Sequence, residues 1–224
     1  KNYKLMEQQH GFQKSVSFSQ YSTYAACPRK WSLVYKDGFY TSQASINMTF
    51  GTAMHGTIQE MLNILYDKTG VEVDKMDLED HFQQEFSKAY KNDYEKNDKK
   101  HFSNPVEMNE FFVDGVNILN QLRKRKSAYF SKKGWWLAGI EIPILISPFK
   151  NKNVLFKGFI DLVLYHEESG EFILYDLKTS SWGWGDKEKK DDIKTSQLLL
   201  YKMFFSQQFG IPLDKIKVEY FVLR

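Results

Sequence analysis

The stretch Gly158-Phe159-Ile160-Asp161-Leu162-Val163-Leu164-Tyr165 is followed by a polar break, His166-Glu167-Glu168-Ser169-Gly170, and then by Glu171-Phe172-Ile173-Leu174-Tyr175-Asp176-Leu177-Lys178-Thr179. Two runs of β-branched and aromatic residues around a Ser-Gly break predict a β-hairpin. If the turn centres on Ser169-Gly170, Asp161 lies opposite Lys178, and Val163 lies opposite Asp176. Because side chains alternate along a strand, Asp161, Asp176 and Lys178 then share one face.

Two acids and a lysine in otherwise apolar strands allow two interpretations. The first is a salt-bridged edge strand in which Asp161 pairs with Lys178. The second is a divalent-metal site, because carboxylate oxygens suit Mg²⁺ or Mn²⁺ and a nearby ammonium can orient a water molecule or neutralise developing charge. Ionised groups on a face that packs against helices are costly unless they are paired or bound to metal.

Composition sets broad bounds on the chain. Its 224 residues are 42% hydrophobic and 16% aromatic, which fits a single ordered domain over residues 1–224. No apolar run approaches the roughly 18 residues of a membrane span, so no membrane partner is expected. A single cysteine is typical of a reducing compartment such as the cytoplasm. A net charge of +3 is too small to indicate a nucleic-acid partner, so any basic surface for nucleic acid must be local.

The first half of the chain reads as helical. Residues 1–16 predict a tail, and residues 17–35 predict short helices in which Arg29 and Lys30 are candidate substrate-binding cations. A helix is expected over residues 50–68, with an apolar stripe bordered by His55. Residues 70–132 predict a helical insert with helices over 77–94 and 107–132. The second helix ends in Arg123-Lys124-Arg125-Lys126, interpreted as a solvated helix end, with phosphate contact as the alternative.

The second half, residues 135–224, predicts the sheet core. Residues 135–146 alternate as a half-buried strand in which Ile140, Ile142, Ile144 and Ile146 share a face and Glu141 interrupts the apolar context. Trp182 and Trp184 stand between glycines before a run of lysines, where they either stack on bases or tuck back onto the sheet. A helix over 192–209 places Gln197 and Tyr201 on one face. The run before Arg224 is strand-like, so a C-terminal truncation is expected.

Several motifs together resemble the PD-(D/E)xK nucleases. Asp161 ahead of Asp176-Leu177-Lys178 is similar to their D…(D/E)-x-K signature. Gly51-x-x-x-His55, Glu141 on the preceding strand and Gln197-x-x-x-Tyr201 resemble the RecB-type exonuclease branch, to which nucleases of CRISPR adaptation are similar. Ser17-x-Ser19-x-Tyr21 followed by Cys27-Pro28-Arg29 matches the opening of that branch. The resemblance extends from about Ser17 to Tyr201.

The resemblance implies an α/β fold: a central mixed β-sheet flanked by helices, with a restriction-endonuclease-like core and an N-terminal helical portion. It implies a metal-dependent DNA exonuclease in recombination, repair or phage DNA processing. His55, Asp161, Asp176 and the Leu177 carbonyl would bind Mg²⁺ or Mn²⁺, with Glu141 in support and Lys178 beside the attacking water. Gln197 and Tyr201 would contact the substrate.

The resemblance also raises the question of an iron–sulfur cluster. Cys27 stands where some relatives place the first of four cluster ligands. The sequence has a single cysteine, so no cluster is expected within residues 1–224 and Cys27 is interpreted as a buried residue; further cysteines beyond Arg224 are the alternative.

Two other functions stay open. One is a non-catalytic nucleic-acid-binding module of a recombination complex, and the other is a structure-specific or site-specific endonuclease. A helicase or recombination partner is compatible with any of the three functions.

Overall fold

The computed structural model describes residues 14–39, 44–147, 154–179, 185 and 192–223. Its N-terminal half contains β1 (Lys14–Val16), α2 (Phe18–Ala26), α3 (Pro28–Trp31), the π-helical turn η1 (Ser32–Lys36), α4 (Ile46–Asp67), α5 (Gly70–Lys75), α6 (Leu78–Lys96) and α7 (Pro105–Tyr129). The sheet elements follow as β2 (Trp135–Ile146), β3 (Val154–His166) and β4 (Glu171–Thr179). The chain then forms α9 (Asp192–Phe209), the 3₁₀ turn η2 (Leu213–Lys215) and β5 (Ile216–Leu223).

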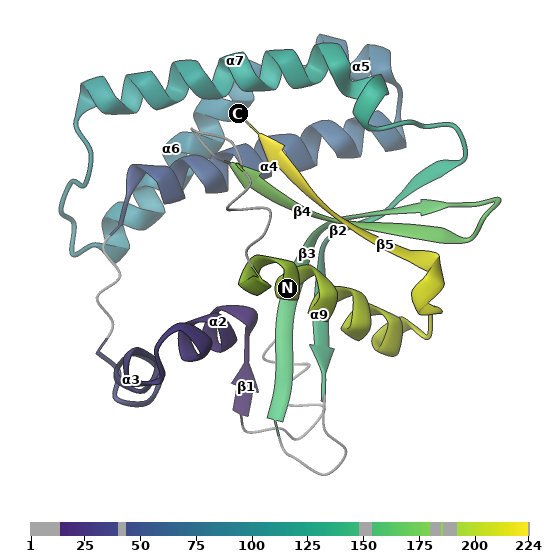
Figure 1. Ribbon diagram of the computed structural model, residues 1–224. Coiled ribbons are helices and arrows are strands. Elements are labelled where there is room, and N and C mark those ends of the chain that lie inside the picture. The colour runs from purple at the N-terminus through teal and green to yellow at the C-terminus, as the bar shows by residue number, and fades with distance from the viewer. Residues whose placement is uncertain (1–13, 40–43, 148–153, 180–184, 186–191, 224) are drawn as a thin grey trace.

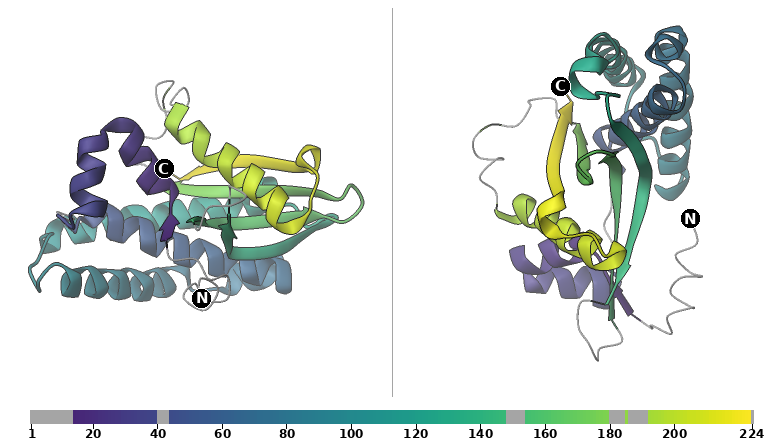
Figure 2. Two further views of the ribbon diagram at one scale, coloured as in Figure 1. Left: turned by 90° about the horizontal axis from the view of Figure 1, so that it is seen from below. Right: turned by 90° about the vertical axis from the view of Figure 1, so that its right-hand side faces the viewer.

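A twisted mixed sheet lies between two helical layers (Figures 1 and 2), which confirms the predicted fold class. Helices α4 to α7 cover one face, and α9 covers the other. One buried cluster joins α4, α6 and α7 to apolar residues of β3 and β4, and a second cluster joins α9 to the opposite face. Within the described ranges, no helix combines the length and the apolar character needed to cross a bilayer.

Strand β3 is the centre of the sheet. Strand β2 pairs antiparallel along β3 from Phe156 to His166. The parallel ladder with β1 ends at Phe156, and the antiparallel ladder with β4 begins at Leu162. Because β2 occupies the other edge over these residues, β1 and β4 lie on the same edge of β3. The part of β3 between their two ladders carries Asp161.

The hairpin between β3 and β4 forms, but its predicted register is wrong by two residues. Val163 pairs with Leu174, and not with Asp176. A four-residue turn over 167–170 connects the strands, with Gly170 in the left-handed region at φ 66°. The observed register, if continued, sets Asp161 opposite Asp176 instead of Lys178. Because a shift of two keeps every side chain on its face, the predicted clustering of Asp161 and Asp176 is unaffected.

Three local interpretations of the N-terminal half are corrected. The end of the expected tail, Lys14–Val16, is a strand that pairs with β3. Cys27 is exposed rather than buried, and its Sγ accepts a hydrogen bond from the Lys30 amide as the cap of α3. The basic end of α7 is partly structural, because Arg123 donates to the Met76 carbonyl at 3.0 Å and Lys126 pairs with Asp74 at 2.6 Å.

Strand β2 departs from the regular alternation that its sequence predicts. Ile140 packs against the cluster on the α4 side, whereas Ile142 packs against the cluster on the α9 side. Residues two apart in a strand normally share a face. Between them Glu141 has a φ of 50°, in the left-handed region that non-glycine residues rarely adopt. The left-handed residue reverses which side chains face each side of the sheet, so β2 contributes to the buried clusters on both the α4 side and the α9 side.

The left-handed backbone of Glu141 predicts an unusual order of stability. Glu141→Gly should be more stable than Glu141→Ala by about 1 kcal/mol, because glycine adopts this φ without the steric cost of a Cβ atom. Ala138 is also exposed on β2 but has no positive φ, so Ala138→Gly should lower the free energy of unfolding. Urea denaturation of the metal-free variants measures both differences. A Glu141→Ala variant as stable as Glu141→Gly would contradict a left-handed residue 141.

Candidate active site

Helix α4 delivers His55 to the sheet by passing close to the end of β4. A Cβ atom on Gly51 would lie 3.2 Å from Thr179 Oγ1, so the absence of a side chain at Gly51 permits this approach. One turn later, His55 borders the buried stripe of α4 and reaches over the sheet edge. The spacing of Gly51 and His55 is thus consistent with the geometry, because the glycine leaves room beside Thr179 and the histidine one turn later approaches Asp161.

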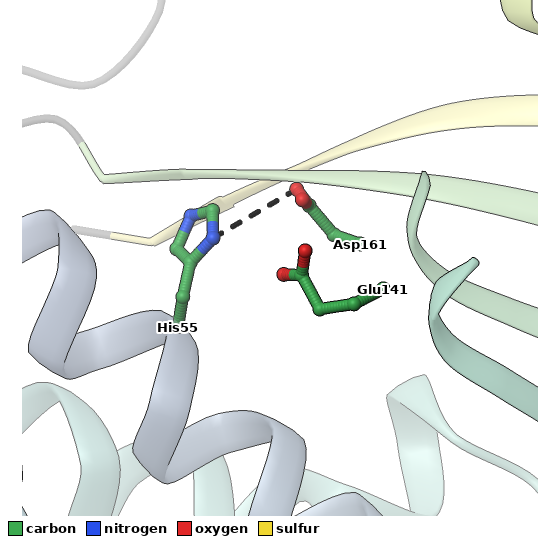
Figure 3. A group of neighbouring side chains, drawn as sticks. All are labelled: His55, Glu141 and Asp161. Carbon is green, nitrogen blue, oxygen red and sulfur yellow. Dashed lines mark ion pairs between the residues drawn. The ribbon is translucent and has the colours of Figure 1, made fainter. Parts of the chain in front are cut away.

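Figure 3 shows His55, Glu141 and Asp161 pointing toward one another from α4, β2 and β3. One ligand atom from each residue lies within 4.8 Å of the other two. His55 Nδ1 is 3.9 Å from Asp161 Oδ2. Glu141 is exposed, whereas His55 and Asp161 are half-buried. An imidazole and two carboxylates thus converge from three separate elements.

The Asp161 carboxylate lies where the regular pairing of β3 with β4 stops. Its Oδ2 accepts a hydrogen bond from the Leu177 amide at 2.7 Å. The Asp161 side chain therefore accepts an N–H of β4 just beyond the last backbone pair of the β3–β4 ladder, Leu162 with Tyr175. This bond fixes the carboxylate against β4 and satisfies a backbone donor.

Asp176 and Lys178 form the adjoining part of the site. Lys178 Nζ lies 2.6 Å from Asp176 Oδ2, and Gln197 Nε2 donates to Asp176 Oδ1 at 3.1 Å. Gln197 Nε2 is also 3.4 Å from the Tyr201 hydroxyl, which agrees with the predicted shared face of α9. The Tyr201 ring packs against Gly158 of β3, where a Cβ atom would come within 2.9 Å of it. Helix α9 thereby positions Asp176 from the face opposite α4.

Burial dominates the electrostatics of the site. It raises the pKa of Asp161 to about 7, with the negative charge of Asp176 adding to the rise and the Leu177 hydrogen bond opposing it. Burial also raises the pKa of Asp176, and the Lys178 ammonium opposes that rise. The pKa of His55 is lowered, first by burial and then by Lys178. The imidazole therefore favours its neutral form and the acids resist ionisation, so the site lacks the positive charge that would stabilise two carboxylates.

The donor set fits a divalent cation. An uncharged imidazole nitrogen and carboxylate oxygens are ligands that Mn²⁺ and related ions accept, and Mg²⁺ suits the oxygens. Asp176 Oδ2 is buried and, among the described residues, accepts no hydrogen bond of ordinary geometry, although it contacts Lys178. This buried oxygen has lone pairs that no directional donor occupies, and its one charged contact is the Lys178 ammonium.

The structure brings most of the predicted site residues together. His55, Glu141 and Asp161 form the close group, and Asp176, Lys178 and Gln197 adjoin it. Arg29 and Lys30 are exposed on α3, where no contact in the described structure ties them to this group. Trp182 and Trp184 lie outside the described residues.

Sequence reasoning missed Gln59. Its Nε2 donates to Glu141 Oε1 at 2.8 Å and lies 3.4 Å from the Asp161 carbonyl oxygen. The available signal was spacing, because a residue four positions after His55 lies on the same face of a helix.

Comparisons with known proteins agree with this geometry. The family model described as the PD-(D/E)XK nuclease superfamily matches residues 15–224. No curated protein matches the chain. The matched region includes every residue of the site and both helical layers that position it. The chain therefore belongs to the PD-(D/E)XK nuclease superfamily, whose members are metal-dependent enzymes that cleave nucleic acids.

Proposed function

We propose that the chain is a divalent-metal-dependent deoxyribonuclease of the RecB-type branch that removes nucleotides from DNA ends. The observation that carries this proposal is the convergence of His55, Glu141 and Asp161 within 4.8 Å, beside the Asp176–Lys178 pair. Its cellular setting, cytoplasmic DNA recombination, repair or phage DNA processing with a helicase or recombination partner, rests on the family resemblance.

Each acid and the imidazole have a role in this proposal. His55, Asp161 and Glu141 hold Mg²⁺ or Mn²⁺, and Asp176 and the Leu177 carbonyl contribute further oxygens. A bound divalent ion supplies Lewis-acid polarisation of the phosphodiester and a water of lowered pKa. The Leu177 amide keeps the Asp161 carboxylate directed into the site through its 2.7 Å hydrogen bond.

Lys178 is the group placed to act on the reacting phosphate. Its side chain is 36% exposed while its partner Asp176 is 7% exposed, so the ammonium lies at the boundary between the buried Asp176 carboxylate and solvent. From there it orients the attacking water or stabilises the charge that develops on phosphorus oxygens. Gln197, which donates to Asp176, and Tyr201 beside it are proposed to contact the substrate, with Arg29, Lys30, Trp182 and Trp184 as further substrate-binding candidates.

Nuclease activity should depend on the acids and on Lys178. With Mn²⁺ and end-labelled linear DNA, Lys178→Ala should lower the rate by about 10²- to 10³-fold, because it removes a preorganised cation. Asp161→Ala and Asp176→Ala should abolish detectable cleavage. Release of label from single- and double-stranded substrates, with a closed circle alongside, measures activity and identifies end dependence.

Asp214→Ala and Lys75→Ala are matched controls, since they remove the same residue types from exposed positions. Cleavage of the closed circle would contradict exonuclease activity and indicate an endonuclease. DNA binding without cleavage by the wild type in any divalent metal would favour the non-catalytic module.

The imidazole ligand predicts the metal preference. Histidine is a softer ligand than carboxylate, so Mn²⁺ should support activity at least equal to that with Mg²⁺ at the same concentration. Replacing the imidazole with a hard oxygen ligand in His55→Asp should shift the ratio toward Mg²⁺. Initial rates with each metal measure the ratio, and a clear Mg²⁺ preference in the wild type would refute the prediction.

The raised pKa of Asp161 predicts how stability depends on pH without metal. The folded chain holds this proton up to about pH 7, whereas an unfolded aspartic acid releases it near pH 4, so folding stability falls as the pH rises between these values. Asp161→Asn cannot ionise and keeps an oxygen for the Leu177 amide. Its stability relative to the wild type should therefore increase from pH 5 to pH 8, by roughly 1–4 kcal/mol.

Chemical denaturation in EDTA at several pH values measures this difference. Added Mn²⁺ should stabilise the wild type more at pH 8 than at pH 6, because it binds the ionised carboxylate, and should stabilise Asp161→Asn much less. A pH-independent difference between the two proteins in EDTA would show that Asp161 titrates normally.

A further inference from the structure

Gln59 connects the helical layer to β2 and β3, the strands that carry Glu141 and Asp161. It follows His55 by one turn of α4 and is half-buried. Its Nε2 lies 2.8 Å from Glu141 Oε1 on β2 and 3.4 Å from the Asp161 carbonyl oxygen on β3. A side-chain amide has two N–H donors, so a single group serves both acceptors.

The contact occurs at the point where β2 departs from regular strand geometry. Backbone pairs flank Glu141 on both sides, Ile140 with Leu162 and Ile142 with Ile160, while Glu141 itself is left-handed. Gln59 donates to the backbone of Asp161, the residue that the same register sets opposite Glu141. The Gln59 side-chain amide thus supports the sheet at the residue where β2 loses its regular alternation of side chains.

Glu141 requires such support more than the other two members of the group. Asp161 is fixed by the Leu177 amide, and His55 is half-buried on α4 with its Nδ1 3.9 Å from Asp161 Oδ2. Glu141 is exposed and has a long side chain, whose ordering costs conformational entropy. The hydrogen bond to Oε1 orders this carboxylate in advance and leaves Oε2 available for another ligand.

We propose that Gln59 is a positioning residue that holds the Glu141 carboxylate in place as a ligand of the divalent ion. The inference rests on the proposed metal-dependent function and adds a residue to it. An amide suits this role because it donates to a carboxylate without adding charge. Groups that orient metal ligands through hydrogen bonds commonly change metal affinity by 10- to 100-fold when they are removed.

Mn²⁺ affinity of the full chain tests the proposal without a nuclease assay. Gln59→Met keeps the length of the side chain and removes the donor, and Gln59→Asn keeps the amide but shortens its reach. Both variants should bind Mn²⁺ about 10- to 100-fold more weakly than the wild type in a titration followed by electron paramagnetic resonance. Using two variants keeps the test valid if one of them does not fold, which circular dichroism detects.

Gln84→Met is the matched control. Gln84 also donates to an acid from a helix, at 2.7 Å to Asp80 Oδ2, but does so on the exposed surface of α6. This variant should retain wild-type Mn²⁺ affinity.

A double-mutant cycle separates positioning from a general structural effect. If Gln59 acts through Glu141, then adding Gln59→Met to Glu141→Ala should produce no further loss of Mn²⁺ affinity. An equal loss in both backgrounds would overturn the proposal, as would unchanged affinity in both single Gln59 variants. A wild-type chain that binds no Mn²⁺ would overturn the proposed function as well, so the two failures are distinguishable.

Discussion

The site depends on one feature of the sheet: β3 changes partners along a single edge, from β1 to β4. Where the ladder with β4 begins, the Asp161 carboxylate accepts a hydrogen bond from the Leu177 amide. In a regular ladder a backbone carbonyl would accept that hydrogen bond. This substitution anchors an acid between two strands. It also lets residues from both helical layers reach the same point, His55 from α4 and Gln197 from α9. Neither layer alone could surround the two acids.

The buried Asp176 and the half-buried Asp161 are compensated differently, and this difference favours a cation. Asp176 has an ammonium and an amide of the chain beside it, Lys178 and Gln197, so much of the cost of its burial is offset internally. Asp161 has a backbone N–H and an imidazole whose pKa is lowered, and the negative charge of Asp176 acts against its ionisation. Buried charge without a counter-charge is destabilising. A divalent ion would relieve that cost, which ties metal binding to the protonation of Asp161.

Local patterns in the sequence predicted the elements that carry the site, but not every contact between them. The bounds of β2 and α9 agree with the predicted ranges, and the spacing of Gln197 and Tyr201 led to an observed contact. The hairpin register was wrong because a four-residue turn replaced the expected one, yet strand parity kept the acids together. Gln59 was missed because its spacing from His55 does not by itself reveal the contact with Glu141, and the left-handed backbone of Glu141 has no signal in the local sequence.

Strand β2 shows what its departure from regular strand geometry provides. A regular strand would have kept Ile140 and Ile142 in one core, as its alternating sequence predicts. Instead the register shift near Ala138 and the left-handed Glu141 let the strand contribute to the α4 core in its first half and to the α9 core in its second. The residue at the crossover belongs to neither core. It can therefore present a carboxylate to Asp161 of β3 without leaving an apolar core incomplete, and the backbone strain there is the cost of that placement.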